Sequence, residues 1–112
     1  MEMDQATAAF AALAQTTRLR AFRLLVQSGP GGLAAGDLAE RLGTPHNTLS
    51  THLGLLARAG LITSERSGRS VRYALDIDGT RKLVNFLVAD CCGGHPEVCK
   101  PIADAIAATE CC

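Results

Sequence analysis

Apolar residues recur at helical spacing along the first part of the chain and predict two helices there. The first covers residues 5–14, where Phe10 and Leu13 share one stripe of an otherwise alanine-rich segment. The second covers about residues 17–27 and ends at the segment SGPGG (28–32), because glycine and proline are strong helix breakers. The apolar face of the second helix is predicted to contain Leu19, Phe22, Leu24, Leu25 and Val26.

A helix-turn-helix pattern follows. A short helix is expected over residues 34–42 and a longer one over 45–59. Thr44 is the predicted N-cap of the longer helix, with Pro45 in its first helical position, and Gly60 follows its end. Two helices joined by a short turn that contains glycine are typical of the helix-turn-helix motif.

Between residues 61 and 75 the spacing of apolar residues changes from the helical period to the alternation typical of strands. The runs LITSER and SVRYAL are prone to form strands, and Ser67-Gly68-Arg69 between them predicts the tip of a hairpin. A helix-turn-helix followed at once by a β-hairpin predicts a winged helix-turn-helix fold, mainly α with a β-hairpin wing. One such domain is expected to span residues 1–112.

Two further helices are expected near the C-terminus, over residues 79–89, after the potential caps Asp76 and Asp78, and over 101–110. Alanine-rich helices at both ends of the chain suggest close packing against a partner, since one small domain has little interior left for them. The expected result is a homodimer, which suits a palindromic DNA site. The apolar face of the first of these two helices is predicted to contain Leu83, Phe86, Leu87 and also Val84.

Eleven basic and eleven acidic residues give a formal net charge of zero, which taken alone argues against a nucleic-acid-binding protein. The balance is uneven along the chain. Residues 16–75 hold eight basic and three acidic residues, a charge of +5, and the remainder holds three basic and eight acidic residues, a charge of −5. A basic central part between acidic ends is therefore compatible with DNA binding.

No apolar run approaches the roughly 18 residues that a membrane span needs, and the N-terminus lacks the features of a signal peptide. A cytoplasmic protein without membrane contacts is therefore expected. In that compartment thiols stay reduced, which bears on the cysteines, all of which lie in the last 22 residues.

The predicted helix 45–59 has two contrasting faces. At about 100° per residue, Leu49, Leu53 and Leu56 define a buried stripe, whereas small polar residues and Gly54 lie opposite. A face of this kind fits a major groove, and arginines around the hairpin tip fit a flanking minor groove or phosphates. The predicted DNA contacts are His46, Asn47, Ser50, Thr51, His52, Arg58, Arg66, Arg69 and Arg72.

Structural alternatives stand beside these DNA contacts. His52 lies near the apolar stripe and is equally explained as a histidine bonded inside the fold. The polar face is also compatible with an ordinary solvated helix, and the charged hairpin with a protected sheet edge. Gly54 permits either close approach of the backbone to DNA or a simple surface glycine.

Cys91 and Cys92 are adjacent, and Cys99 follows after Gly93-Gly94. Soft thiolates select soft ions, and three sulfurs without a required fourth ligand suit a pyramidal ion such as As(III) or Sb(III). Inert buried cysteines and a redox switch are the alternatives. A disulfide between neighbouring cysteines is disfavoured by strain.

Zinc would need a fourth ligand, from His95 or from the pair Cys111-Cys112. No catalytic set of nucleophile, base and orienting group stands out, no glycine-rich phosphate loop is present, and the cysteine spacing is not that of a thiol oxidoreductase. An enzyme is therefore not expected.

The segment ALAQTTRLRAFRLL, which ends at Leu25, resembles the opening helices of the ArsR/SmtB family of metal-sensing repressors. The segments TPHNTLSTHLGLLARAGLI (44–62) and SERSGRSVRYAL (64–75) are similar to its recognition helix and wing. The likeness extends over about residues 8–90. It implies a dimeric winged-helix protein that leaves its operator when an ion binds.

The segment DCCGGHPEVC (90–99) resembles a variant class of arsenite-responsive repressors whose cysteine trio lies after the wing, and this resemblance implies Cys91, Cys92 and Cys99 as ligands. The family's better-known arsenic site, a C-x-C pair before the recognition helix, has no counterpart in LAAGDLAERL (33–42). Its His/Asp zinc site is not evident, and the terminal cysteine pair has no firm counterpart.

The expected function is an arsenite-responsive transcriptional repressor that binds palindromic operator DNA and dissociates when As(III) or Sb(III) binds. A sensor of Zn(II), Cd(II) or another thiophilic ion is one alternative, and a redox- or persulfide-responsive repressor is another. A cytosolic metalloid carrier that never meets DNA is the alternative from a different class.

Overall fold

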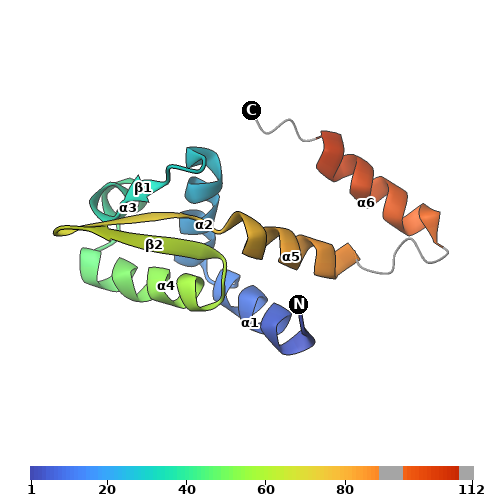
Figure 1. Cartoon of the computed structure of the whole chain (residues 1–112), viewed down its shortest axis with the longest axis horizontal. Coiled ribbons are helices and arrows are strands. Elements are labelled where there is room, and N and C mark those ends of the chain that lie inside the picture. The colour runs from blue at the N-terminus through green and yellow to red at the C-terminus, as the bar shows by residue number, and fades with distance from the viewer. Residues whose placement is uncertain (89–94, 109–112) are drawn as a thin grey trace.

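The structure, a computed structural model, describes residues 1–88 and 95–108. Helices dominate it, and one small sheet projects from the helical part (Figure 1). In chain order the elements are α1 (Met3–Leu13), α2 (Thr16–Ser28), β1 (Leu33–Ala34), α3 (Ala35–Leu42), α4 (His46–Arg58), β2 (Ile62–Ser67), β3 (Ser70–Leu75), α5 (Ile77–Val88) and α6 (Pro96–Ala108).

The sheet is antiparallel with strand order β1-β3-β2. Ile62 pairs with Leu75 at the base of the hairpin and Ser67 with Ser70 at its tip, where Gly68 adopts a φ of 63°. The predicted tip is thereby confirmed, as is the mainly α winged helix-turn-helix fold. The two-residue strand β1 was not predicted, since so short a segment carries no period of its own.

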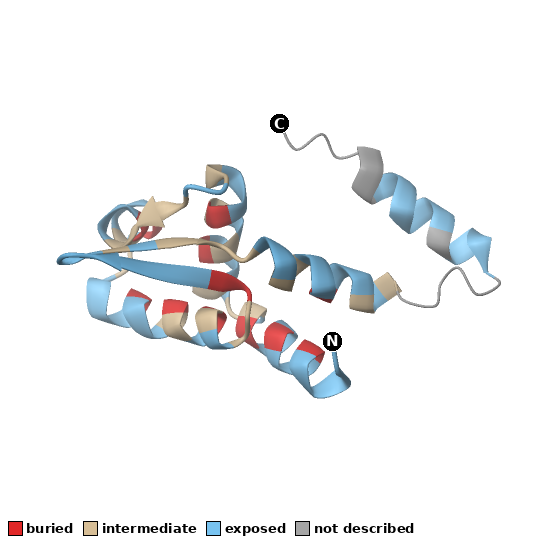
Figure 2. Cartoon of the chain, in the orientation of Figure 1, coloured by how far each residue is buried: buried red, intermediate tan, exposed pale blue. Residues whose placement is uncertain are grey.

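Leucines form the centre of the core, beneath the sheet and between the helices (Figure 2). The stripe predicted for α4 is confirmed, because Leu49, Leu53 and Leu56 are at most 1% exposed. Leu25 of α2 and Leu38 of α3 are fully buried as well. The core therefore fixes α4 by one face and leaves its other face to solvent.

The buried stripe of α1 consists of alanines, and the predicted stripe of Phe10 and Leu13 lies beside it. Ala6, Ala9 and Ala12 are buried, whereas Phe10 is 37% exposed and Leu13 is half-buried. The physical reason is distance: α1 packs on both α2 and α4, and small side chains allow the helices to approach closely.

The face predicted for α2 was wrong in part. Ala21 and Leu25 face the core, Leu19 and Val26 are about half exposed, and Phe22, like Leu24, lies at the edge. This helix has apolar residues on several sides, so its orientation is decided by the elements packed against it, chiefly α4 and β3, and not by its own pattern.

The turn before α4 differs from the prediction. Pro45 is the N-cap and α4 starts at His46 without a capping side chain. The hydroxyl of Thr44 instead donates to the carbonyl of Leu42 at 3.3 Å, so Thr44 completes the end of α3 and does not begin α4.

Helix α5 begins two residues earlier than predicted. Its first turn is capped by Asp76, whose carboxylate accepts a hydrogen bond from the Gly79 N–H at 2.9 Å. Leu83 is buried and Phe86 half-buried, as predicted, but Leu87 is 63% exposed and the edge residue Val84 is 38% exposed. The outer side of α5 is thus left uncovered by residues 1–88 and 95–108.

Helix α6 begins at Pro96, before the predicted start, and contains Pro101. Proline fits the first turn of a helix, which explains the earlier start. The side chains described for α6 are all exposed, and the helix lies apart from the winged-helix part (Figures 1 and 2). Among the described helices, none is both long and apolar enough to cross a membrane.

Candidate nucleic-acid interface

The outer face of α4 is polar and open. Asn47, Ser50, Thr51 and Arg58 are all exposed, opposite the buried leucines of the same helix. At Gly54 an added Cβ would meet nothing within 4 Å, so the face has no local obstruction there. These small hydrogen-bonding groups can approach base edges in a major groove.

The N-terminal end of α4 lies beside the wing. His46 and Ser50 line a small cavity of about 60 Å³ together with Val71 and Tyr73 of β3. His46 is exposed in the first turn, where no side chain caps the free backbone N–H groups. Such groups, with the helix dipole, favour a phosphate oxygen.

His52 has a partner inside the fold. Its Nδ1 lies 3.1 Å from a guanidinium nitrogen of Arg18, and the histidine is half-buried. Because a guanidinium only donates, Nδ1 of His52 is the acceptor in this contact. The contact agrees with the alternative of a histidine bonded inside the fold, and the role of His52 in DNA binding stays a prediction.

Arg18 connects three helices, and sequence reasoning did not single it out. Its Nε donates to the carbonyl of Ala12 at the end of α1, while its guanidinium meets His52 on α4. Its backbone N–H donates to the side chain of Gln15, the N-cap of α2. No local sequence pattern predicts this role, because 34 positions separate Arg18 from His52.

The three arginines of the hairpin divide into two kinds. Arg66 and Arg69 are exposed, and the side chain of neither has a hydrogen-bond or ion-pair partner among the described residues. Arg72 donates to the backbone carbonyls of Gly31 (3.3 Å) and Gly32 (3.1 Å). Arg66 and Arg69 are therefore available to phosphates, whereas the structure gives Arg72 partners at the base of the wing.

Gly32 makes the attachment of the wing possible. It has a φ of 70°, and a Cβ there would lie 1.9 Å from the carbonyl oxygen of Tyr73 on β3. The sequence SGPGG marked this segment only as a helix breaker. Its second role is close approach of two backbones, which only glycine permits here.

The predicted cysteine ligands fall mostly outside the part of the chain that the structure describes. Cys91 and Cys92 lie beyond it, as do Cys111 and Cys112, and of Cys99 only the backbone is described, in the first turn of α6. Within the described residues, no group of three or more His, Cys, Asp or Glu side chains is placed to hold a metal ion.

His95 has a carboxylate neighbour in the described segment. Its Nδ1 lies 3.1 Å from Oε1 of Glu97, and both side chains are exposed. A hydrogen bond from its own backbone N–H and a second from His95 hold the pKa of Glu97 below its ordinary value. The structure gives His95 this partner and leaves its role as a metal ligand a prediction.

Comparison with known proteins points to one family. Residues 13–65 match the family model described as "Helix-turn-helix domain". The HTH-type transcriptional regulator CmtR of Mycobacterium tuberculosis is 42% identical over 64 residues, which cover 57% of this chain and 52% of CmtR. The chain thus spans about half the length of this curated relative.

Two solved structures share the fold. The homodimeric winged helix-turn-helix DNA-binding domain of Mb0332 from Mycobacterium bovis, a possible ArsR-family transcriptional regulator, is 30% identical with a TM-score of 0.64, and the match covers 83% of this chain and 85% of that one. An ArsR-like transcriptional regulator from Rhodococcus is 25% identical with a TM-score of 0.65, over 96% and 94% of the two chains. The chain therefore belongs to the ArsR family of winged helix-turn-helix proteins.

Proposed function

We propose that this chain is a cytoplasmic transcriptional repressor that binds palindromic operator DNA as a homodimer, and that it is not an enzyme. One observation carries the proposal: the exposed polar face of α4 lies beside a wing whose Arg66 and Arg69 have no partner among the described residues. Helix α4 would lie in the major groove, with Asn47, Ser50 and Thr51 toward base edges. Arg58 and the two wing arginines would contact phosphates or the flanking minor groove.

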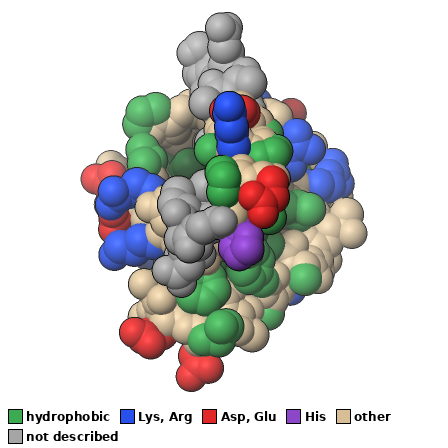
Figure 3. Space-filling view, turned by 90° about the vertical axis from the view of Figure 1, so that its right-hand side faces the viewer, with side chains coloured by type: hydrophobic (Ala, Val, Ile, Leu, Met, Phe, Trp, Pro, Cys, Tyr) green, Lys and Arg blue, Asp and Glu red, His purple; other side chains and the backbone are tan. Residues whose placement is uncertain are grey.

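The homodimer is supported by large apolar side chains that are exposed in the part of the chain that the structure describes. Figure 3 looks onto the end of the molecule that carries α5 and α6, and apolar side chains gather across this face. Burying such groups against a second copy is favourable, at about 25 cal/mol per Å². Among the described residues, the large apolar side chains exposed on α1, α5 and α6 are Met3, Phe10, Ile77, Val84, Leu87, Val98 and Ile102.

The proposed inducer is As(III) or Sb(III), which Cys91, Cys92 and Cys99 would hold. Three thiolates match a soft, three-coordinate ion, and the reduced state of the cytoplasm keeps them available. The two described elements around the first pair are α5, which ends at Val88, and α6, which begins at Pro96. Bringing the three cysteines together constrains the chain between helices proposed to form the dimer.

That constraint would release DNA by changing the separation of the two recognition helices in the dimer. A coupling of about 1–3 kcal/mol between the ion site and the DNA site corresponds to an affinity loss of about 5- to 150-fold. A change of this size is sufficient, because the neutral net charge of the chain limits non-specific attraction to DNA.

Fluorescence anisotropy tests both the DNA-binding part and the ion-release part of the proposal. The probe is a palindromic duplex that the chain itself selects from a random library. Ser50→Ala and Arg69→Ala should weaken binding, and affinity should fall with added salt because phosphate contacts release counterions. Unchanged binding by both variants, or no duplex selected at all, would favour a metalloid carrier that never meets DNA.

The ion part is tested by titrating the complex with As(III), Sb(III), Cd(II), Zn(II) and peroxide. As(III) and Sb(III) should release wild-type protein and the matched control Cys111→Ser/Cys112→Ser, but not Cys91→Ser/Cys92→Ser. Release of the latter variant by arsenite as readily as wild type would show that the site is wrong. Preferential release by Zn(II) or Cd(II) would identify another thiophilic-ion sensor, and release by peroxide that a thiol reverses would identify a redox switch.

A further inference from the structure

The arginines without a partner among the described residues fall into two groups. Arg58, Arg66 and Arg69 belong to the proposed DNA surface. Every member of the second group is exposed, and all of them border a groove between α2 and α3 that the DNA proposal does not use. The second group consists of Arg20, Arg23 and Arg41.

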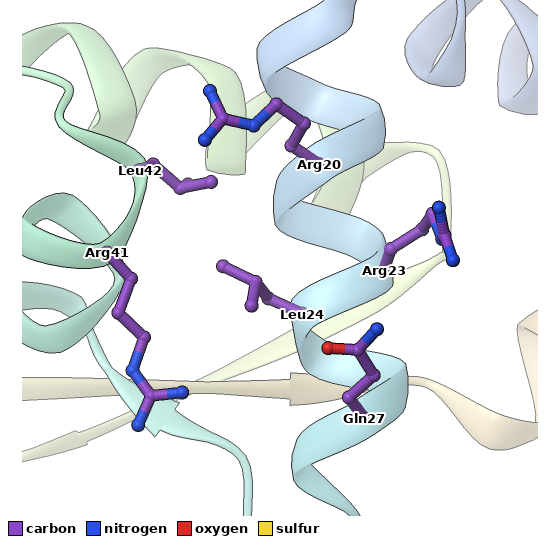
Figure 4. Close-up of a pocket in the computed structure, with 6 residues that line it drawn as sticks. All are labelled: Arg20, Arg23, Leu24, Gln27, Arg41 and Leu42. Carbon is purple, nitrogen blue, oxygen red and sulfur yellow. The ribbon is translucent and has the colours of Figure 1, made fainter.

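The groove has an apolar floor and charged sides. A cavity of about 240 Å³ is lined by the three arginines with Leu24, Gln27 and Leu42. Figure 4 shows Leu24 of α2 and Leu42 of α3 pointing toward one another, with Arg20 and Arg41 on either side of them. A second cavity of about 290 Å³ shares Leu24, Gln27 and Arg41, so the groove continues toward β1.

The groove opens away from the recognition helix. At about 100° per residue, Arg23 lies roughly opposite the midpoint of Ala21 and Leu25, which face the core. Arg18, which meets α4, lies on the core side of α2. Arg23 therefore points to a different side of the domain from α4.

No carboxylate of the described residues forms an ion pair with these arginines. Asp37 and Glu40 lie on α3 itself, yet neither is within ion-pair distance of Arg20 or Arg41 in the described structure. Elsewhere the chain does pair its basic residues, as Arg81 and Lys82 do with Asp78. A guanidinium binds a carboxylate or phosphate through two parallel hydrogen bonds, and an apolar floor accepts the body of a small molecule.

We propose that the α2–α3 groove binds a small organic anion, with its apolar part on Leu24 and Leu42 and its carboxylate or phosphate at the flanking arginines Arg20 and Arg41. Arg23 and Gln27 lie along the outer edge and add polar contacts for a longer ligand. None of the residues that line this groove is among the predicted DNA contacts, and the site does not depend on the proposed function.

The test is an NMR titration of the full chain with phenyl phosphate, observing the side-chain Nε–H signals of the arginines. Signals of Arg20 and Arg41 should shift and saturate, with a Kd of about 1 mM for a ligand of this size. Inorganic phosphate, which lacks the apolar part, should bind about tenfold more weakly. Arg20→Gln/Arg41→Gln should weaken phenyl phosphate binding at least about tenfold, whereas Arg66→Gln/Arg69→Gln, with the same charge change, should not.

Three outcomes would overturn the proposal. The first is equal shifts at Arg66 and Arg69, and the second is no saturation of the Arg20 and Arg41 signals in the wild-type chain, which needs no variant to fold. The third comes from DNA binding: if Arg20→Gln/Arg41→Gln weakens duplex binding more than about tenfold and lowers its salt dependence, the groove arginines are phosphate contacts of the operator.

Discussion

The central part of the chain and its terminal helices differ in how far their large apolar side chains are buried. The central part runs from α2 to β3, and the inward-facing leucines of its helices α3 and α4 are almost fully buried. Leu38 and Leu53, for example, are at most 1% exposed. On the terminal helices, Leu87 of α5 is 63% and Val98 of α6 is 54% exposed. The leucine core thus lies mainly in the central part, whereas α5 and α6 leave large apolar side chains exposed among the described residues.

The charges follow the same division. The central part carries +5 and the remainder −5, so the basic surface is the one that the core positions firmly. The terminal helices combine acidic charge with exposed apolar residues, which fits a second copy and not DNA. The shape of the proposed DNA surface is therefore a property of one chain, whereas the spacing of two such surfaces would depend on the proposed homodimer.

The largest expected effect concerns the covered leucines. Leu53→Ala should lower the free energy of unfolding by about 2–5 kcal/mol, because it removes buried contacts and leaves a cavity. Leu55→Ala is the matched control on the same helix, where the side chain is 37% exposed, and should cost at most about 1 kcal/mol. Urea denaturation of both variants measures this, and equal losses would contradict the assignment of faces on α4.

The helix-turn-helix and the wing were predictable because their signals are local. The spacing of Leu49, Leu53 and Leu56 sets the inner face of α4, and Gly68 suits the tight turn of the hairpin. The orientation of α2 was not predictable in this way. Its apolar residues surround much of the helix, so contacts with α4 and β3 decided the outcome.

The candidate DNA surface was predictable as a face but not in every side chain. Exposure of Asn47 and Ser50 follows from the helical period, whereas Arg72 turns to the carbonyls of Gly31 and Gly32 across 40 positions of sequence. Such long-range pairings leave no trace in a local pattern. For the cysteine trio the prediction came from a resemblance and stays a prediction.

The next-largest expected effect is a loss of stability at the contact between the central part and the start of α5. At Gly79, in the first turn of α5, an added Cβ would lie 1.8 Å from the carbonyl oxygen of Gly60. Since that oxygen belongs to the backbone, the clash can be relieved only by shifting α5 or the Gly60 segment, which costs stability. Gly79→Ala should cost about 3 kcal/mol. Gly54→Ala, where an added Cβ meets nothing, should stabilise α4 by up to about 1 kcal/mol. Thermal unfolding should separate the two variants in sign, and a stable Gly79→Ala variant would argue against this packing of α5.

A smaller effect should appear only in self-association. Leu87→Ser on the exposed side of α5 should weaken the proposed dimer by about ten- to a hundredfold, since about 1.5–3 kcal/mol of burial is lost. Val26→Ser on α2, which is 47% exposed, is the control outside the terminal helices and should leave the dimer unchanged. Sedimentation equilibrium measures both. If Val26→Ser is the more damaging variant, the second copy covers α2 and not α5.

The smallest effect is electrostatic and lies at the start of α5. Hydrogen bonds from Arg81 and Lys82, in that order, hold the pKa of Asp78 below its ordinary value of 3.8. A lowered pKa means that the ionised carboxylate stabilises the folded state above about pH 4, and that this contribution disappears as the pH falls through the folded-state pKa. Because the side chains are more than half exposed, solvent screens the pairs and the change in stability should be slight. An NMR titration of the Asp78 carboxyl carbon should give a midpoint below 3.8. The midpoint should rise in Arg81→Gln but not in the control Arg66→Gln. A midpoint unmoved by Arg81→Gln would show that the ion pair at the start of α5 does not persist in solution.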